Sequence, residues 1–300
     1  MPLVGLGTWL TTGAECERLV AAGLAAGLRA IDGSENYFNS DAIGRAVEAS
    51  GVPRSELFLA SKLSHAASYS REGARAALTA QLHSMRTSYL DLFMLHSVGP
   101  SVNAMREAWG EMRAMQAEGL VRAVGVSNFQ ITDLESLLAH DSASTGGSVV
   151  ATLQNKFSPY HPGALHTGGV DYARFCRDKG ITLVAYCPLN AWPSALSPLD
   201  DVLVAHIAIQ LNRTPAQVLL RWALQRGAAV LTRSSSESHL RETAALHDFE
   251  LDAMHDAVVS GLGWLALSPT NRPPASVEDI LGVQAAEEMA RQLRAMRSEL

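Results

Sequence analysis

The sequence is poor in the features that mark secreted, nucleic-acid-binding and membrane proteins. It has only three cysteines, Cys16, Cys176 and Cys187, and this odd, sparse set favours a reducing compartment over a disulfide framework. Its net charge of −6 lacks the basic excess that binding to a phosphate backbone requires. No apolar run approaches the roughly 18 residues of a membrane span, and no signal peptide is recognisable. We therefore expect a soluble cytoplasmic protein with neither a nucleic-acid nor a membrane partner.

Motifs of several common active sites are absent too. GLGTWL fails the dinucleotide pattern of Rossmann folds because Leu10 stands where the third glycine belongs, and GLGWLA at Gly261–Ala266 fails similarly. The chain has no Walker phosphate loop and no HExxH, and its cysteine spacing fits no zinc pattern. We therefore expect no metal site and no glycine-rich nucleotide loop.

What the chain does have is a regular alternation of short apolar segments with longer amphipathic ones. Segments that are apolar throughout are typical of parallel strands buried on both faces. The predicted strands are Pro2–Gly7, Arg29–Asp32, Leu57–Lys62, Leu90–His96, Val121–Ser127, Val149–Asn155, Ile181–Tyr186 and Ala228–Arg233. The predicted helices between them include Ala14–Ala26, Val102–Glu118 and Thr214–Arg226, whereas the Ser/Gly-rich stretch Asp141–Ser148 is expected to be a loop.

This alternation predicts an α/β fold in which right-handed crossovers join parallel strands. Eight units within 300 residues favour closure into one (β/α)8 TIM barrel over residues 1–300, with a C-terminal loop and tail over about 264–300. An open, doubly wound sheet is the alternative architecture.

Several of the apolar segments end in side chains that form hydrogen bonds. In a TIM barrel the C-terminal ends of the strands share one face, where the active sites of this fold are built. We therefore expect one shared polar pocket. The residues at or just beyond the segment ends are Asp32, Tyr37, Lys62, His96, Ser127, Asn128, Gln154, Tyr186, Arg233 and Ser234.

Each of these residues also has a structural explanation when it is taken alone. Asp32 suits a turn cap, His96 a hydrogen-bonded core histidine, and the Ser127-Asn128 pair the cap of the next helix. Only their joint placement favours a functional site.

Ordered motifs surround these residues: GLGTW, IDGSENYFN, ASKL, DLFMLH, GVSNF, QNKFSPY, AYCPL and TPAQVLLRWALQRG. Together they resemble the aldo-keto reductase superfamily over nearly the whole chain. The resemblance implies a TIM barrel enzyme that reduces small-molecule aldehydes or ketones. It also implies a catalytic tetrad of Asp32, Tyr37, Lys62 and His96.

The resemblance further implies a nicotinamide cofactor, NADPH by preference with NADH as the alternative. The positions implied are Ser127, Asn128 and Gln154 at the carboxamide, Tyr186 on the nicotinamide ring, Arg233 and Ser234 at the 2′-phosphate, and His239 and Glu242 at the adenosine. The adenosine end departs from the family pattern, because Thr243 replaces a usual asparagine and His239 a usual arginine. The sequence therefore predicts nicotinamide binding more strongly than a strict preference for NADPH.

Carbonyl reduction needs a proton donor, and the tetrad supplies one. A free tyrosine has a pKa near 10, and a neighbouring ammonium is expected to lower it. In this hypothesis Tyr37 donates the proton, Lys62 lowers the pKa of Tyr37, and Asp32 holds Lys62 in place. His96 donates a hydrogen bond to the carbonyl oxygen and orients the substrate.

The predicted substrate pocket is wide, since small residues stand where the family's best-known members carry tryptophan. Ser64 and Ser97 follow the candidate Lys and His, and two indoles of roughly 150–250 Å² each are thereby lost. The expected pocket residues are Trp9, Phe38, Ser97 and Trp192. We expect bulky or polar carbonyl compounds to be preferred over compact aromatic aldehydes.

Two other functional classes fit the same fold. One is a redox-sensing or scaffolding barrel that binds cofactor with little turnover, which the complete tetrad argues against. The other is an isomerase or lyase acting on phosphorylated sugars, which the lack of a glycine-rich phosphate loop late in the chain argues against. No segment marks a surface for a protein partner.

Overall fold

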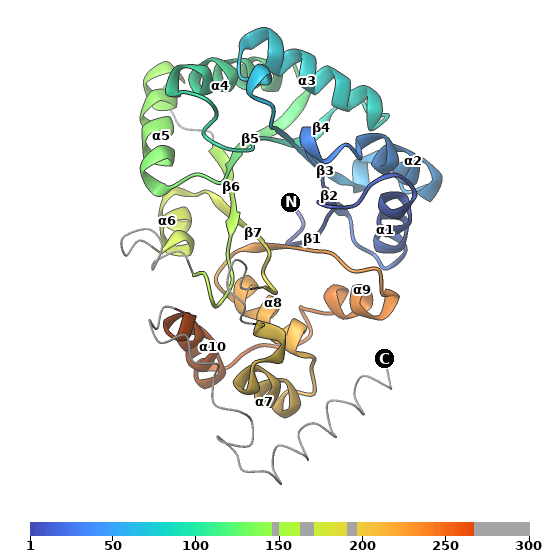
Figure 1. Ribbon diagram of the computed structural model, residues 1–300, viewed down its shortest axis with the longest axis vertical. Helices are drawn as coiled ribbons and strands as arrows, with labels where there is room; N and C mark the ends of the chain where they lie inside the picture. The colour runs from blue at the N-terminus through green and yellow to red at the C-terminus, as the bar shows by residue number, and fades with distance from the viewer. Residues whose placement is uncertain (146–149, 163–170, 191–196, 267–300) are drawn as a thin grey trace.

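The computed structural model describes residues 1–145, 150–162, 171–190 and 197–266, and its centre is a closed barrel of eight parallel strands. Each strand pairs with the next one in the chain, and β8 closes the barrel against β1 (Figure 1). The prediction of a (β/α)8 TIM barrel is therefore confirmed, and an open sheet is excluded. The strands are β1 (Val4–Gly7), β2 (Ala30–Asp32), β3 (Phe58–Leu63), β4 (Leu90–Leu95), β5 (Val121–Ser127), β6 (Val150–Lys156), β7 (Thr182–Tyr186) and β8 (Ala229–Thr232).

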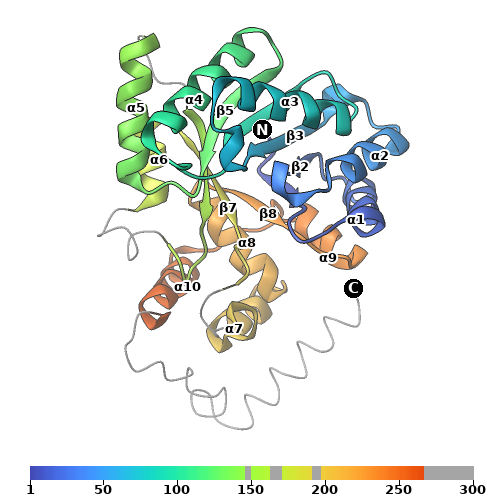
Figure 2. The same cartoon turned by 45° about the horizontal axis from the view of Figure 1, so that its top comes forward.

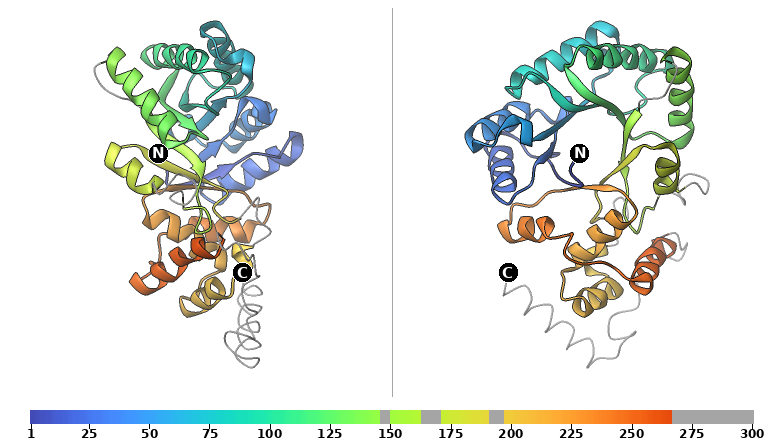
Figure 3. Two further views of the ribbon diagram at one scale, coloured as in Figure 1. Left: turned by 60° about the vertical axis from the view of Figure 1, so that its left-hand side comes forward. Right: turned by 180° about the vertical axis from the view of Figure 1, so that it is seen from behind.

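Helices wrap the outside of the barrel, as Figure 2 and both views of Figure 3 show. The α-helices are α1 (Gly13–Ala25), α2 (Ser40–Ser50), α3 (Arg71–Ser84), α4 (Val102–Ala117), α5 (Ile131–Thr145), α6 (Tyr172–Lys179), α7 (Val202–Gln210), α8 (Pro215–Gln225), α9 (Glu237–Ala244) and α10 (Ala253–Ala266). Short 3-10 helices are η1 (Glu35–Tyr37), η2 (Arg54–Glu56), η3 (Ala66–Ser68) and η4 (Pro198–Asp200). None of these described helices is both long and apolar enough to span a membrane.

Local signals fix the ends of two helices. Thr214 caps α8 with a capping box, in which its hydroxyl accepts from the Gln217 backbone and the Gln217 side chain accepts from the Thr214 backbone. Gly119, at φ +81°, follows the end of α4 in a conformation that glycine adopts without strain.

The predicted loop at Asp141–Ser148 is wrong over its first part, because α5 continues to Thr145. Asp141 is buried, and its carboxylate accepts a hydrogen bond from the indole Nε1 of Trp109 at 3.0 Å. A polar residue that looked solvated is thus a buried partner on a helix. The predicted tail lies, from residue 267 onward, outside the described residues, so the predicted domain bounds stay a prediction.

The alternation of side chains along each strand explains which polar groups enter the barrel. Residues two apart point to the same face of a strand, and Ala30, Phe58 and Leu92 line a small cavity of about 20 Å³ inside the barrel. Asp32 lies two residues after Ala30 and lines the same cavity. Lys62 and His96 lie four residues beyond Phe58 and Leu92, so the same alternation turns both side chains inward at the C-terminal end.

One glycine makes room on this inner face. A Cβ at Gly125 of β5 would lie 2.1 Å from the Thr152 hydroxyl of β6, so a larger residue would push the two strands apart. The register between β5 and β6 shifts at this point, between Val124 and Val126.

The N-terminal end of the barrel holds an ion cluster. Asp91, buried at the start of β4, accepts hydrogen bonds from Arg54 at 2.7 Å, from Arg122 at 3.0 Å and from the Leu59 backbone at 2.9 Å. The two guanidinium groups also lie 3.9 and 4.2 Å from the centre of the Tyr89 ring. Because polar groups at this end of a TIM barrel serve stability, we assign this cluster to the scaffold.

Candidate active site

A lysine–aspartate pair is buried at the opposite, C-terminal end of the barrel. Lys62 is 0% exposed and Asp32 4% exposed, and the Lys62 ammonium forms an ion pair with Oδ1 of Asp32. The ammonium also donates to the Gly33 carbonyl at 2.9 Å, while Gln154 Nε2 donates to Oδ2 of Asp32 at 2.9 Å. Both carboxylate oxygens are therefore satisfied, as a buried charge requires.

Tyr37 completes this arrangement from the 3-10 helix η1, which follows β2. The phenol oxygen of Tyr37 accepts a hydrogen bond from the Lys62 ammonium at 3.4 Å. The rings of Tyr37 and His96 meet edge to face, with their centroids 5.8 Å apart. The structure thus brings together all four residues of the predicted tetrad.

The predicted direction of the Tyr37 pKa is wrong for this arrangement. Burial raises the pKa of Tyr37 above its ordinary value, and the Asp32 carboxylate raises it further. Burial also lowers the pKa of Lys62, against the opposing effect of Asp32. Since Lys62 and Asp32 form a nearly neutral pair, their combined field does not outweigh desolvation of the phenolate.

His96 lies just beyond β4 and is neutral at pH 7. Burial, followed by the nearby Lys62 charge, lowers the pKa of His96 from 6.5 to about 4. Its Nδ1 atom lies 2.7 Å from the Ser64 hydroxyl oxygen and 3.1 Å from that of Ser34. The Nε2 atom is therefore the ring nitrogen available to a bound carbonyl group.

Glu35 holds these loops together, a role that the sequence reasoning did not predict. Its carboxylate accepts hydrogen bonds from the backbones of Ser64 and His65, at 2.7 and 3.0 Å, and from the Ser68 hydroxyl at 2.7 Å. Because Glu35 begins the 3-10 helix that carries Tyr37, it fixes Tyr37 relative to the loop after Lys62. The only signal in the sequence was an acidic residue inside a polar strand-end motif.

The residues predicted for the nicotinamide carboxamide lie side by side at the ends of β5, β6 and β7. Asn128 adopts φ +58°, donates to the His96 carbonyl at 2.9 Å and accepts from the Tyr186 hydroxyl at 2.7 Å. Ser127 donates to the Gln154 carbonyl at 2.8 Å. Amide and hydroxyl groups next to an aromatic ring match the chemistry of an aromatic carboxamide, so the donor set fits the group predicted there.

The residues predicted for the phosphate and adenosine are only partly brought together. Arg233 is exposed just after β8 and donates to the Trp9 carbonyl at 2.5 Å. The hydroxyl oxygen of the next residue, Ser234, lies 3.3 Å from Nδ1 of His239. Glu242 instead faces α8, where its carboxylate accepts from the Thr214 hydroxyl at 2.8 Å, and its predicted cofactor role stays a prediction.

Apolar side chains rim the mouth of the barrel. Trp9 is 55% exposed and Phe38 is 78% exposed, and Phe38 lies beside the His65 ring at a centroid distance of 6.0 Å. Ser97 is exposed after His96. The predicted pocket residue Trp192 lies outside the described residues.

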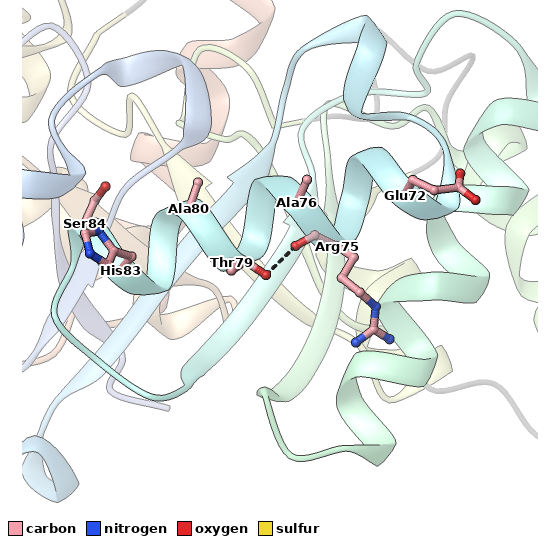
Figure 4. Close-up of a pocket in the computed structure, with 7 residues that line it drawn as sticks. All are labelled: Glu72, Arg75, Ala76, Thr79, Ala80, His83 and Ser84. Carbon is pink, nitrogen blue, oxygen red and sulfur yellow. Dashed lines mark hydrogen bonds between the residues drawn. The ribbon is translucent and has the colours of Figure 1, made fainter.

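A surface groove of about 790 Å³ lies elsewhere, along α3, and contains none of the candidate residues (Figure 4). In Figure 4 the Thr79 hydroxyl donates to the Arg75 carbonyl on the same helix, at 2.8 Å. The Arg75 guanidinium is committed to Glu111 and Glu118, so the groove offers no converging reactive groups. No group of three or more His, Cys, Asp or Glu side chains suited to a metal ion occurs among the residues that the structure describes.

Comparison with known proteins gives a consistent result. The model of the Aldo/keto reductase family matches residues 3–260. An aldo-keto reductase of Mycolicibacterium vanbaalenii is 36% identical over 262 residues, which cover 87% of this chain and 88% of the relative. An aldo-keto reductase of Mycobacterium tuberculosis is also 36% identical, over 268 residues and 87% of each chain. The crystal structure of an aldo/keto reductase from Brucella melitensis superposes with a TM-score of 0.78 at 28% identity, covering 87% of this chain and 95% of that one.

Proposed function

Because the chain belongs to the aldo/keto reductase family of oxidoreductases, we propose that it reduces aldehydes or ketones to alcohols with Tyr37 as the proton donor and NADPH as the preferred cofactor. The observation that carries the proposal is the contact between the Tyr37 phenol and the buried Lys62–Asp32 pair. A buried, charged pair is costly to maintain, and one that meets a phenol at the mouth of a TIM barrel is placed for proton transfer.

The raised pKa of Tyr37 suits the reductive direction. Burial and Asp32 keep the phenol protonated throughout the neutral range, so a proton is always available for the alkoxide that forms on reduction. The carbonyl carbon would accept the hydride that a nicotinamide held near Ser127, Asn128 and Gln154 would supply. In the opposite direction Tyr37 would have to lose its proton before it could accept one from an alcohol, so alcohol oxidation should need alkaline conditions.

His96 has a separate task in this mechanism. A neutral imidazole with a proton on Nε2 donates a hydrogen bond to the carbonyl oxygen and stabilises its developing charge, like one donor of an oxyanion hole. The lowered pKa keeps His96 neutral at pH 7. Tyr37 and His96 would then both contact the carbonyl oxygen of the substrate. Tyr37 would donate its proton to this oxygen, and His96 would orient it through a hydrogen bond.

Ser127, Asn128 and Gln154 would hold the nicotinamide carboxamide, with the ring against Tyr186. Arg233 and Ser234 would meet the 2′-phosphate of NADPH, for which an exposed guanidinium is well suited. Ser97, Trp9 and Phe38 would line the substrate side, where an open rim favours bulky or polar carbonyl compounds.

Two measurements test this function. Quenching of protein fluorescence by NADPH and by NADH reports cofactor binding, and turnover on a panel of aldehydes and ketones reports catalysis. Binding without turnover would favour a redox sensor, and lack of binding would refute the proposal.

A variant of Arg233 tests the cofactor preference. Arg233→Ala should weaken NADPH binding about tenfold or more and leave NADH binding nearly unchanged, because the lost charge-assisted hydrogen bonds reach only the 2′-phosphate. Arg174→Ala, which removes an exposed guanidinium on α6, is the matched control and should change neither. Equal weakening of both cofactors by Arg233→Ala would make Arg233 a structural residue.

A further inference from the structure

The loop that carries Trp9 is anchored at both ends, whereas its tip is exposed. Thr8 and Thr11 are buried, and Asn39 Nδ2 donates to both of their backbone carbonyls at 2.9 Å. Between them, Trp9 is 55% exposed and Leu10 is 65% exposed. Leu10 also adopts φ +62°, a left-handed conformation that is strained for a leucine. The loop itself therefore contains little that fixes its tip.

One side chain from the neighbouring strand end reaches this tip. Arg233 lies just after β8, which pairs with β1 to close the barrel (Figure 1), and its Nη1 donates to the Trp9 carbonyl at 2.5 Å. Among the residues that the structure describes, the Trp9 carbonyl and the Arg233 side chain form no other hydrogen bond. Because the carbonyl and the indole of Trp9 share one backbone, Arg233 also orients the indole.

The Arg233 guanidinium can bind a second partner without giving up the first. A guanidinium carries five N–H groups in a fixed fork, and the contact with Trp9 uses one of the two on Nη1. The Nε–H and Nη2–H groups form a separate edge, which suits bidentate binding of a phosphate. Arg233 is exposed, so this edge is accessible to a ligand. One guanidinium can therefore hold a phosphate and the Trp9 carbonyl at the same time.

We propose that Arg233 is a specificity-determining residue that bridges the 2′-phosphate of NADPH and the Trp9 carbonyl, so that the phosphate fixes the Trp9 wall of the substrate pocket. The proposal rests on the proposed function, which puts the phosphate at Arg233 and the substrate beside Trp9. An exposed arginine loses side-chain freedom when it binds a single partner. A phosphate that already immobilises the guanidinium removes this cost, so NADPH strengthens the contact with Trp9, whereas NADH does not.

The bridge makes substrate affinity depend on which cofactor is bound. Single-turnover kinetics at saturating cofactor separate the Kd of a bulky ketone from the rate of hydride transfer. The Kd should be about fivefold lower with NADPH than with NADH, the lower range of coupling between two sites. The rate of hydride transfer should differ little, because Tyr37 and His96, which hold the reacting oxygen, stay in place.

Arg233→Lys separates the bridge from binding of the phosphate. An ammonium still attracts the phosphate, but it is a compact charge without the fork that spans two partners. NADPH should therefore remain the preferred cofactor, while the difference in ketone Kd between the two cofactors falls from about fivefold to none. In a Trp9→Ala background, Arg233→Lys should change the ketone Kd no further, so the two substitutions should be non-additive. Arg174→Lys, on the exposed face of α6, is the matched control and should leave the difference intact.

A spectroscopic measurement detects the bridge without any catalysis. In protein labelled with 5-fluorotryptophan, the 19F NMR resonance of Trp9 reports the surroundings of its indole, and its loss in Trp9→Phe assigns it. The probe 2′,5′-ADP carries the 2′-phosphate without a nicotinamide, and 5′-ADP is the matched probe that lacks this phosphate. Titration with 2′,5′-ADP should shift the Trp9 resonance in the wild type and much less in Arg233→Lys. Titration with 5′-ADP should give only the smaller shift in both proteins.

The outcomes distinguish failure of the bridge from failure of the proposed function. A Trp9 resonance that does not respond to bound 2′,5′-ADP, or that responds equally in Arg233→Lys, would overturn the bridge. Lack of 2′,5′-ADP binding would refute the phosphate role of Arg233 and the bridge with it. A phosphate-dependent shift in a protein that turns over no carbonyl compound would uphold the bridge and refute the reductase function.

Discussion

Two buried aspartates, at opposite ends of the barrel, are each held by cations but are built differently. Asp91, at the N-terminal end, binds two arginines, and one of them, Arg122, has 57% of its side chain exposed. Asp32, at the C-terminal end, binds Lys62, whose side chain is 0% exposed. Both carboxylates are fully hydrogen-bonded, so the difference lies in the cation and in its access to water.

The comparison shows how the same kind of ion pair serves stability at one end and chemistry at the other. An arginine stays charged, forms several fixed hydrogen bonds and stacks on Tyr89, so the cluster around Asp91 is inert. A buried lysine is a compact charge with a readily shifted pKa. The Lys62 ammonium also donates one hydrogen bond to the Tyr37 phenol oxygen. Four predictions test this difference between the two ends of the barrel, beginning with the largest expected effect.

Loss of the hydroxyl should lower turnover at Tyr37, beside the Lys62–Asp32 pair, but not at Tyr89, beside Asp91 and its arginines. Tyr37→Phe should lower kcat for carbonyl reduction by about 10²–10⁴-fold, because it removes the proton donor but not the ring. Cofactor affinity should change little. Tyr89→Phe keeps the ring between its two arginines and should leave turnover unchanged. Steady-state kinetics with one aldehyde measure both, and an active Tyr37→Phe enzyme would mean that another group supplies the proton.

The two cations should differ in their contribution to folding. Lys62→Met leaves Asp32 buried without its partner and should cost about 3–5 kcal/mol of unfolding free energy. Arg122→Met removes an exposed partner from a cluster that retains Arg54, and should cost about 1 kcal/mol. Chemical denaturation measures both.

A second substitution guards this test against a variant that fails to fold. Lys62→Met combined with Asp32→Asn leaves no unpaired buried charge, so it should recover much of the lost stability while remaining inactive. If Lys62→Met alone lowered the unfolding free energy as little as Arg122→Met, burial of the cation would not explain a difference between the two ends of the barrel.

The positions of these residues could be predicted because their signals are local. An apolar run that ends in Asp32 or Lys62 shows both a buried strand and its polar end, and Thr214-Pro215 shows a helix start. The pKa of Tyr37 was predicted in the wrong direction because burial of the phenol, followed by the Asp32 carboxylate, raises it. The balance of these influences on the pKa depends on how the folded site is packed, and a sequence motif does not show it.

The contacts between loops could not be predicted for a related reason. Ser34, Ser64 and His96 come from three separate strand ends, 30 and 32 residues apart along the chain, and meet only when the barrel closes. In the sequence alone, Ser64 is notable only because it stands where the family's best-known members carry tryptophan. Asp141 was misjudged in the same way, since its partner Trp109 lies on another helix.

The C-terminal end should also be sensitive to acid through His96. Its pKa is lowered from 6.5 to about 4, so between these values the unfolded chain binds a proton that the folded protein does not. The stability that neutral His96 contributes is therefore complete above pH 6.5 and falls by roughly 3 kcal/mol as the pH drops toward 4.

The matched variant isolates this effect from the acid response of the carboxylates. His96→Gln keeps an amide of similar size without a titratable group. The difference in unfolding free energy between wild type and variant should be constant above pH 7 and shrink, or reverse, toward pH 4. A constant difference across the whole range would show that the folded protein does not depress the His96 pKa.

The smallest expected effect concerns the shape of the mouth beside His96. The backbone of Ser97 is fixed by the Tyr69 hydroxyl, which donates to the Ser97 carbonyl at 2.8 Å, while the Ser97 side chain is exposed. Ser97→Trp should therefore be accommodated without moving His96, and its indole should narrow the opening rimmed by Trp9 and Phe38. We expect the ratio of kcat/KM for a compact aromatic aldehyde to that for a larger polar ketone to rise about tenfold, the scale at which pocket shape discriminates. Ser97→Ala removes only the hydroxyl and should leave the ratio near its wild-type value. Because the indole adds contacts only at the substrate side, NADPH affinity should be unchanged; an unaltered ratio in Ser97→Trp would mean that Ser97 does not line the substrate pocket and that the wide-mouth hypothesis fails.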